Sequence, residues 1–156
     1  ALGADGVQIG TRFAFTEESS AAPAFKQVCL NLNEGDTKLL LKKLSPTRLV
    51  ANKFRTVLEE AEARDASPEE LLEIIGVGRA RLGMFDGDID NGELEIGQIA
   101  SLFKGRTVQS VADVMSELHA EYAGALARLI TSPRCGKSRS VERIFEILGI
   151  TSHNRE

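Results

Sequence analysis

The residues with the clearest chemical potential lie near the start of the chain, where a short apolar run ends in Gly10-Thr11. Val7-Gln8-Ile9 is rich in β-forming residues and has the length of a buried strand. Backbone N–H groups project from the carboxyl end of such a strand, and a glycine there lets an anion approach closely. (β/α)8 barrels bind phosphate at this kind of place, in the loops after their last two strands. A plain buried strand with a glycine turn explains the same residues, so both interpretations stay open.

An acidic loop, residues 86–92, raises the question of a calcium site. An EF-hand loop needs acidic residues at positions one, three and five, glycine at six and glutamate at twelve. Counted from the first aspartate, the acidic positions fit, but position six is Asn91 and position twelve is Gly97. The pattern therefore favours a structural loop over a calcium site.

If the loop is structural, its residues should form specific turns. We expect Asp88 and Asp90 to form an Asx-type turn, with Gly92 supplying an unusual backbone angle. Gly97-Gln98 follows, inside a segment expected to be helical. A glycine within a helix costs roughly 1 kcal/mol relative to alanine, so it marks close packing or a nearby ligand. We favour close packing for Gly97 and keep Gln98 as a candidate pocket residue.

The remaining side chains that bind metals or nucleotides have no spacing that suits either role. Cys29 and Cys135 lie far apart, and the chain has only two histidines, His119 and His153. We therefore predict neither a metal site nor a disulfide framework. His119 is expected to be an exposed or satisfied helix residue. Residues 135–138 read Cys-Gly-Lys-Ser, but the upstream glycine and strand of a phosphate loop are missing.

The length and composition of the chain are those of an ordinary globular protein of one domain. The chain has 156 residues, of which 42% are hydrophobic and 27% charged, and 19 Lys+Arg against 23 Asp+Glu give a net charge of −4. No basic cluster suggests nucleic acid, and no apolar run approaches the ~18 to 20 residues that span a bilayer. We therefore expect no nucleic-acid or membrane partner and a cytoplasmic location. The first Met is Met84 and no signal peptide precedes it, so we expect a piece of something larger.

Periodicity and capping residues predict few strands and many helices. Thr37 to Leu41 is a weak second strand, and Ser67-Pro68 is a strong helix start because serine suits the N-cap and proline the first turn. The expected helices are 23–30, 45–58, 67–75, a short stretch ending near Met84, 94–104, 108–130 and 141–148, with the end of another at 1–4. A single strand cannot bury itself, so this pattern implies partner strands elsewhere.

Two segments of the chain carry a family resemblance. Residues 2–13 resemble the eighth strand of FMN-dependent barrels of the nitronate monooxygenase family, which includes the enoyl-ACP reductase II enzymes. Residues 87–100 resemble the family's Gly-Asp-x-(Asp/Glu)-x-Gly loop and the Gly-Gln that follows it. Weaker resemblances lie between them in family order, at Phe25-Lys26-Gln27, Asp36-Thr37 and 48–54. Five patches in order make coincidence improbable.

The resemblance implies an α/β fold: the C-terminal portion of a TIM (β/α)8 barrel, with its last strand, followed by a mostly helical C-terminal region. Residues 1–31 would end the FMN-binding barrel, and 32–131 would form the helical region of the same domain. Residues 132–156 depart from the family pattern and would be an extension of unknown role or a read-through of a broken gene. The apolar stripe of the helix at 108–130 would pack across the barrel exterior.

The resemblance also implies FMN as cofactor. The cofactor-binding residues carried over are Gly10 and Thr11, as phosphate ligands, and Gln98. Arg12, next along the chain, could approach the phosphate, but we favour a role as an anchor of the loop. No catalytic residue matches within this chain, because the family's lie upstream of the matching segments.

The activity implied is oxidation of alkyl nitronates with O2, and the alternative within the family is an FMN-dependent enoyl-ACP reductase II. The substrate would accordingly be a small molecule, a nitronate or an enoyl thioester. The fragment alone is expected to be inactive. An alternative of another class is a non-catalytic helical remnant or interaction module, which the lopsided element pattern also fits.

Overall fold

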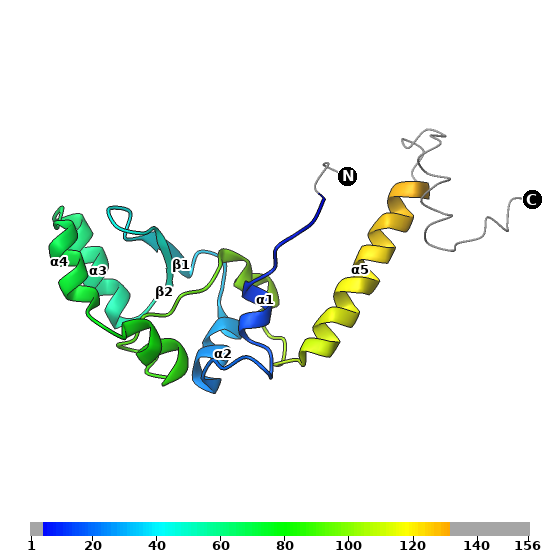
Figure 1. Ribbon diagram of the computed structural model, residues 1–156, viewed down its shortest axis with the longest axis horizontal. Coiled ribbons are helices and arrows are strands. Elements are labelled where there is room, and N and C mark those ends of the chain that lie inside the picture. The colour runs from blue at the N-terminus through cyan, green and yellow to red at the C-terminus, as the bar shows by residue number, and fades with distance from the viewer. Residues whose placement is uncertain (1–4, 132–156) are drawn as a thin grey trace, which may run out of the picture. The chain divides into compact units, whose positions relative to one another are not determined.

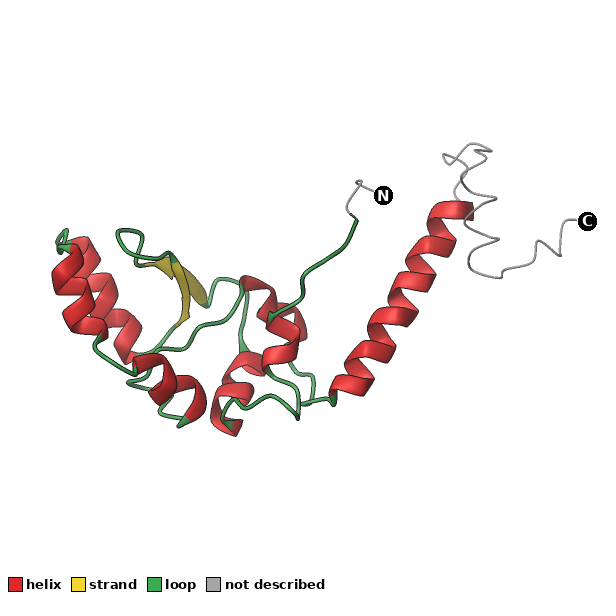
Figure 2. Ribbon diagram, viewed as in Figure 1, coloured by secondary structure: helices red, strands yellow, loops and turns green. Residues whose placement is uncertain are grey.

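The computed structural model describes residues 5–131, and the expectations for residues 1–4 and 132–156 lie outside this range. The described chain is mixed α/β, mostly helical, with one small two-stranded sheet (Figure 2). Residues 7–114 form one compact unit, and the described residues 5–6 and 115–131 belong to another. None of the described helices is long and apolar enough to cross a membrane.

The sheet is a hairpin of β1 (Thr37–Leu40) and β2 (Thr47–Val50), paired antiparallel with Thr37 opposite Val50. β1 confirms the expected second strand. β2 contradicts the expected helix from residue 45, although the spacing of its apolar residues fits a helix. Pairing with β1 outweighs that local pattern, and Leu41 turns the chain with a φ of 58°.

A third segment, Leu94–Ile96, lies along the free edge of β2. The N–H of Val50 donates to the Leu94 carbonyl at 3.0 Å, and the N–H of Ile96 donates to the Arg48 carbonyl at 3.3 Å. The expected helix from residue 94 is therefore wrong at its start, because these backbone groups are used by β2. A 3₁₀ helix, η2 (Gln98–Phe103), follows, and Gly105 turns the chain with a φ of 77°.

Two of the described helices begin at side-chain caps. Ser67 accepts a hydrogen bond from the N–H of Glu70, as its N-cap position predicts, and Asn52 caps the next helix upstream in the same way. The helices are α1 (Thr11–Ala14), α2 (Pro23–Asn31), α3 (Lys53–Ala63), α4 (Pro68–Ile75), the π-helical turn η1 (Arg81–Phe85) and α5 (Val111–Thr131). Figure 1 shows α3 and α4 side by side, close to the hairpin.

The expected strand at Val7–Ile9 is not a strand in this structure. Residues 6–10 run without a strand partner among the described residues, and Val7 is 85% exposed. A strand needs a neighbour to bond its backbone, and none of the described strands lies beside it. The specific barrel portion expected here is therefore not confirmed by the described residues.

Two apolar clusters hold residues 7–114 together. One joins α2 to the Leu94–Ile96 segment and η2, and its largest fully buried side chain is Phe25. The other joins the hairpin to α3 and α4, around Leu49, Leu58 and Leu71. Because Val50 belongs to the first cluster and Leu49 to the second, β2 links the two.

Candidate functional site

The turn at Gly10-Thr11 directly precedes α1. The N–H groups of Phe13 and Ala14 both donate to the Gly10 carbonyl, at 3.0 and 3.2 Å, which fixes the start of the helix. A Cβ built on Gly10 would meet nothing within 4 Å. The backbone of Gly10 therefore faces open space, as an anion-binding turn requires.

Arg12 fastens this turn to η2. The side chain is buried, and its guanidinium carbon lies 5.2 Å from the centroid of the Phe103 ring. The ring of Phe15 lies 5.5 Å from that of Phe103, so the same aromatic side chain also contacts the end of α1. A buried guanidinium over an aromatic face is a favourable cation–π contact. The interpretation of Arg12 as an anchor of the loop is confirmed.

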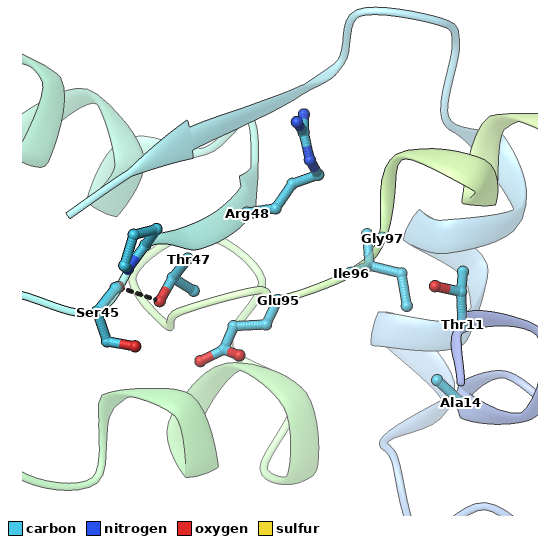
Figure 3. A pocket seen from close by; sticks show the side chains of 9 residues that line it. Thr11, Ala14, Ser45, Thr47, Arg48, Glu95, Ile96 and Gly97 are labelled. Atoms are coloured by element: carbon cyan, nitrogen blue, oxygen red, sulfur yellow. Dashed lines mark hydrogen bonds between the residues drawn. The ribbon is translucent and has the colours of Figure 1, made fainter. Parts of the chain in front are cut away.

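Thr11 lines an open pocket of about 460 Å³ beside β2 (Figure 3). Figure 3 shows Thr11 pointing toward Gly97, with Glu95 and Thr47 across the pocket. The lining residues are Thr11, Ala14, Ser45, Pro46, Thr47, Arg48, Glu95, Ile96 and Gly97. Hydroxyl, guanidinium and carboxylate groups make the pocket polar, although Nη1 of Arg48 is engaged with the Thr37 carbonyl at 3.3 Å.

The structure brings Thr11 together with Gly97 but places Gln98 elsewhere. A Cβ on Gly97 would overlap Oγ1 of Thr11, so the interpretation of Gly97 as a close-packing glycine is confirmed. Gln98 lines a second pocket, of about 580 Å³, with Leu32 and Leu102. Within the described residues, Gln98 therefore does not share a pocket with Thr11.

The acidic loop is built as a turn around Asp88. Its Oδ1 accepts hydrogen bonds from the N–H groups of Asp90, at 3.2 Å, and Asn91, at 2.9 Å. The bonds from Asn91 are the main cause that holds the pKa of the Asp88 carboxyl below its ordinary value. The Asx-type turn is confirmed at Asp88. The role given to Gly92 is wrong: it has no positive φ, and instead lies against the Gly83 backbone, where a Cβ would overlap.

Asn52 joins the loop to α3. Its Nδ2 donates to the carbonyls of Ile89, at 3.0 Å, and Gly92, at 2.8 Å, while its Oδ1 caps the helix. Lys53 pairs with the Asp90 carboxylate at 3.0 Å. We call this set of contacts the Asn52 junction. Two of the patches that carry the family resemblance, residues 48–54 and 87–100, thus meet in space.

Several residues of this region were missed by sequence reasoning. Phe103 is 91 positions from Arg12 and carries no local signal for that contact. Lys26 is buried and donates from Nζ to the carbonyls of Glu17, at 3.2 Å, and Ser19, at 2.8 Å, which ties down the loop after α1. Its place on the apolar face of α2 was a signal that could have been used.

Cys29 and His119 are the cysteine and the histidine among residues 5–131. Burial raises the pKa of the Cys29 thiol to about 12, so it stays protonated and is not a nucleophile at neutral pH. His119 lies exposed on α5, as expected. No group of three or more His, Cys, Asp or Glu among residues 5–131 could hold a metal ion.

The chain is similar to known proteins in both sequence and structure. The family model described as nitronate monooxygenase matches residues 1–121. A probable nitronate monooxygenase of Bacillus subtilis (strain 168) is 44% identical over 64 residues, which are 40% of this chain and 18% of that protein.

Two solved structures are also similar. FabK from Thermotoga maritima superposes with a TM-score of 0.71 and 28% identity, over 81% of this chain and 40% of that one. Its M276A mutant gives 0.66 and 25%, over 81% and 37%. The chain thus spans less than half the length of each of these proteins. Because the family model covers well over half of its residues, the chain belongs to the nitronate monooxygenase family.

Proposed function

We propose that the chain works as the C-terminal part of an FMN-dependent oxidoreductase, and that its Gly10-Thr11 turn holds the FMN phosphate. The observation that carries this proposal is the open backbone at Gly10, in a turn fixed by the Gly10 carbonyl and by Arg12. Family membership supports the identity of the cofactor. The extended residues 6–10 would then form the last strand of a TIM barrel whose other strands lie outside these residues.

The residues of the turn fit a phosphate group. Gly10 has no side chain to block an oxygen, and its backbone directly precedes the first residue of α1. Bonds from backbone N–H groups to an ionised oxygen are stronger than neutral ones. Thr11 would add its backbone N–H, while its hydroxyl faces Gly97 and the pocket. FMN, when bound, supplies the redox chemistry, and these residues bind and orient it.

Gln98 is kept in the proposal as a flavin contact. It directly follows Gly97, so it begins the segment against which the turn packs. Its amide is exposed and can donate and accept hydrogen bonds. A contact with the flavin would be made from the second pocket and not from the one that Thr11 lines.

For the whole protein we propose oxidation of alkyl nitronates with O2, in the cytoplasm. The family description and the 44% identity to a probable nitronate monooxygenase favour this branch. The alternative is reduction of an enoyl thioester as an enoyl-ACP reductase II, favoured by the extent of the likeness to FabK. None of the described residues carries a substrate contact that separates the two.

A direct test uses the purified protein that contains these residues, loaded with FMN. Oxygen uptake that requires an alkyl nitronate would support the proposal. Oxidation of a reduced nicotinamide that requires an enoyl thioester would move the assignment to the reductase branch. A protein that retains no FMN after reconstitution, and shows neither activity, would contradict the proposed function in both forms.

A further inference from the structure

We propose that Gly97 and Phe103 are positioning residues for the phosphate-binding turn, so that η2 sets the orientation of Gly10 and Thr11 before the cofactor arrives. This inference rests on the proposed function. It assigns roles to two residues that touch neither the phosphate nor the reacting atoms.

The first contact is between Thr11 and Gly97. A Cβ on Gly97 would overlap Oγ1 of Thr11 and lie 3.6 Å from its Cβ. Gly97 has a φ of −67° and a ψ of 150°, angles that any residue adopts, so glycine is not needed here for its backbone freedom. What the position requires is the absence of a side chain. The Thr11 hydroxyl therefore occupies the space that a side chain at position 97 would take.

The second contact is between Arg12 and Phe103. Arg12 is only 6% exposed, and its guanidinium lies over the Phe103 ring. Phe103 is held in turn by Phe15 and by Arg106, whose guanidinium carbon lies 5.6 Å from the ring centroid. The ring is thus fixed on several sides, and it can act as a firm support for Arg12.

Together the two contacts fix the turn at two points. Gly97 precedes η2 and Phe103 ends it, while Thr11 and Arg12 are neighbours in the turn. Contacts at both ends of one rigid segment oppose a rotation of the turn about either one. A turn held in this way loses little conformational freedom when phosphate binds, which is the general advantage of preorganisation. The orientation of the Gly10-Thr11 backbone would therefore be set before phosphate binds.

The test compares single and double substitutions of Gly97 and Thr11, in the flavin-binding protein that contains this chain. Gly97→Ala should push the Thr11 side chain away and weaken FMN binding about ten-fold or more, the scale of one lost charge-assisted hydrogen bond. Thr11→Ala removes Oγ1 and should cost less. The double variant should bind nearly as well as Thr11→Ala, because the added methyl group then meets only Cβ at an ordinary distance. Gly124→Ala, which adds a methyl group in α5, is the matched control and should leave affinity unchanged.

A second experiment tests the role of the Phe103 ring. Phe103→Leu should weaken FMN binding, whereas Phe103→Tyr, which keeps the aromatic face, should restore it. NMR amide shifts of residues 10–13 should move in Gly97→Ala and return in the double variant, with no cofactor present.

The outcomes separate the two proposals. Equal loss of affinity in Gly97→Ala and in the double variant would overturn the inference, because a general packing defect is not relieved by removing Oγ1. Unchanged affinity in Gly97→Ala would overturn it as well. If the unaltered protein bound no FMN, the proposed function would fail, and the amide shifts alone would then decide whether Gly97 positions the turn.

Discussion

The Asn52 junction and the segment of residues 6–10 both lie in patches that carry the family resemblance, but their surroundings differ. In the junction, the side-chain amide of Asn52 bonds two carbonyls and caps a helix. In the segment, Val7 is exposed, and the described residues provide no strand partner. The first has its contacts within the chain, whereas the second keeps its backbone available. The difference indicates that the junction supports the fold. In the proposed function, the open segment leads to the turn that would bind phosphate.

The largest effect on stability is expected where two glycines touch. Gly92→Ala would drive a methyl group into the Gly83 backbone, where little adjustment is available, and should lower the free energy of unfolding by about 3 kcal/mol. Gly6→Ala, in the open segment, meets nothing within 4 Å and should change it by less than about 0.5 kcal/mol. Urea denaturation of both variants measures the contrast. Equal losses would remove the distinction between the two regions.

A smaller loss is expected from the amide of Asn52. Asn52→Ala removes an N-cap and two hydrogen bonds to carbonyls, and should cost about 2 kcal/mol. Asn31→Ala makes the same chemical change at the exposed end of α2, where one hydrogen bond to the Gln27 carbonyl is lost, and serves as the control. Thermal melts of the two variants should separate clearly. If Asn31→Ala cost as much, the junction would have no special role.

A pH-dependent effect concerns the carboxyl group of Glu93, which lies just beyond the junction. Burial, and then the charge of Glu95 and a hydrogen bond with it, raise the pKa of the Glu93 carboxyl to about 7, while Arg79 opposes the rise. The folded chain therefore holds this proton more tightly than the unfolded chain does. Stability from this group is present below about pH 4.5 and is lost as the pH rises toward 7.

Glu93→Gln should flatten that part of the stability profile and give its largest relative gain above pH 7. Denaturation midpoints measured from pH 4 to 8 test the expectation. An unchanged slope in the variant would mean that Glu93 is not the group that titrates.

Sequence reasoning succeeded where the determining contacts are local. Ser67-Pro68 predicted the start of α4 because an N-cap is made with the next three residues. Asp88 predicted its turn for the same reason. β2 was predicted as a helix because its apolar residues recur at helical spacing, and only the hairpin partner, ten or so positions upstream, decides otherwise.

The site was predictable only in part. The Gly-Thr pair was a candidate from its place after a β-rich run, and only the family resemblance assigned it to phosphate, with Arg12 beside it. The contacts of Thr11 with Gly97 and of Arg12 with Phe103 join residues far apart in sequence, and no local pattern specifies them. The strand at residues 7–9 was predicted from composition, but a strand forms only beside another strand. None of the described strands lies beside these residues.

The central claim is that the turn at Gly10 holds the FMN phosphate. The most direct measurement compares flavin occupancy with turnover per bound flavin in Gly10→Val, in the protein that contains this chain. Valine would fill the open space over Gly10 and remove a charge-assisted hydrogen bond worth about 1.5 to 3 kcal/mol, or about ten- to a hundred-fold in FMN affinity. Turnover per bound flavin should change little, because the phosphate is remote from the reactive ring. Full occupancy with a collapse of turnover per flavin would contradict the claim.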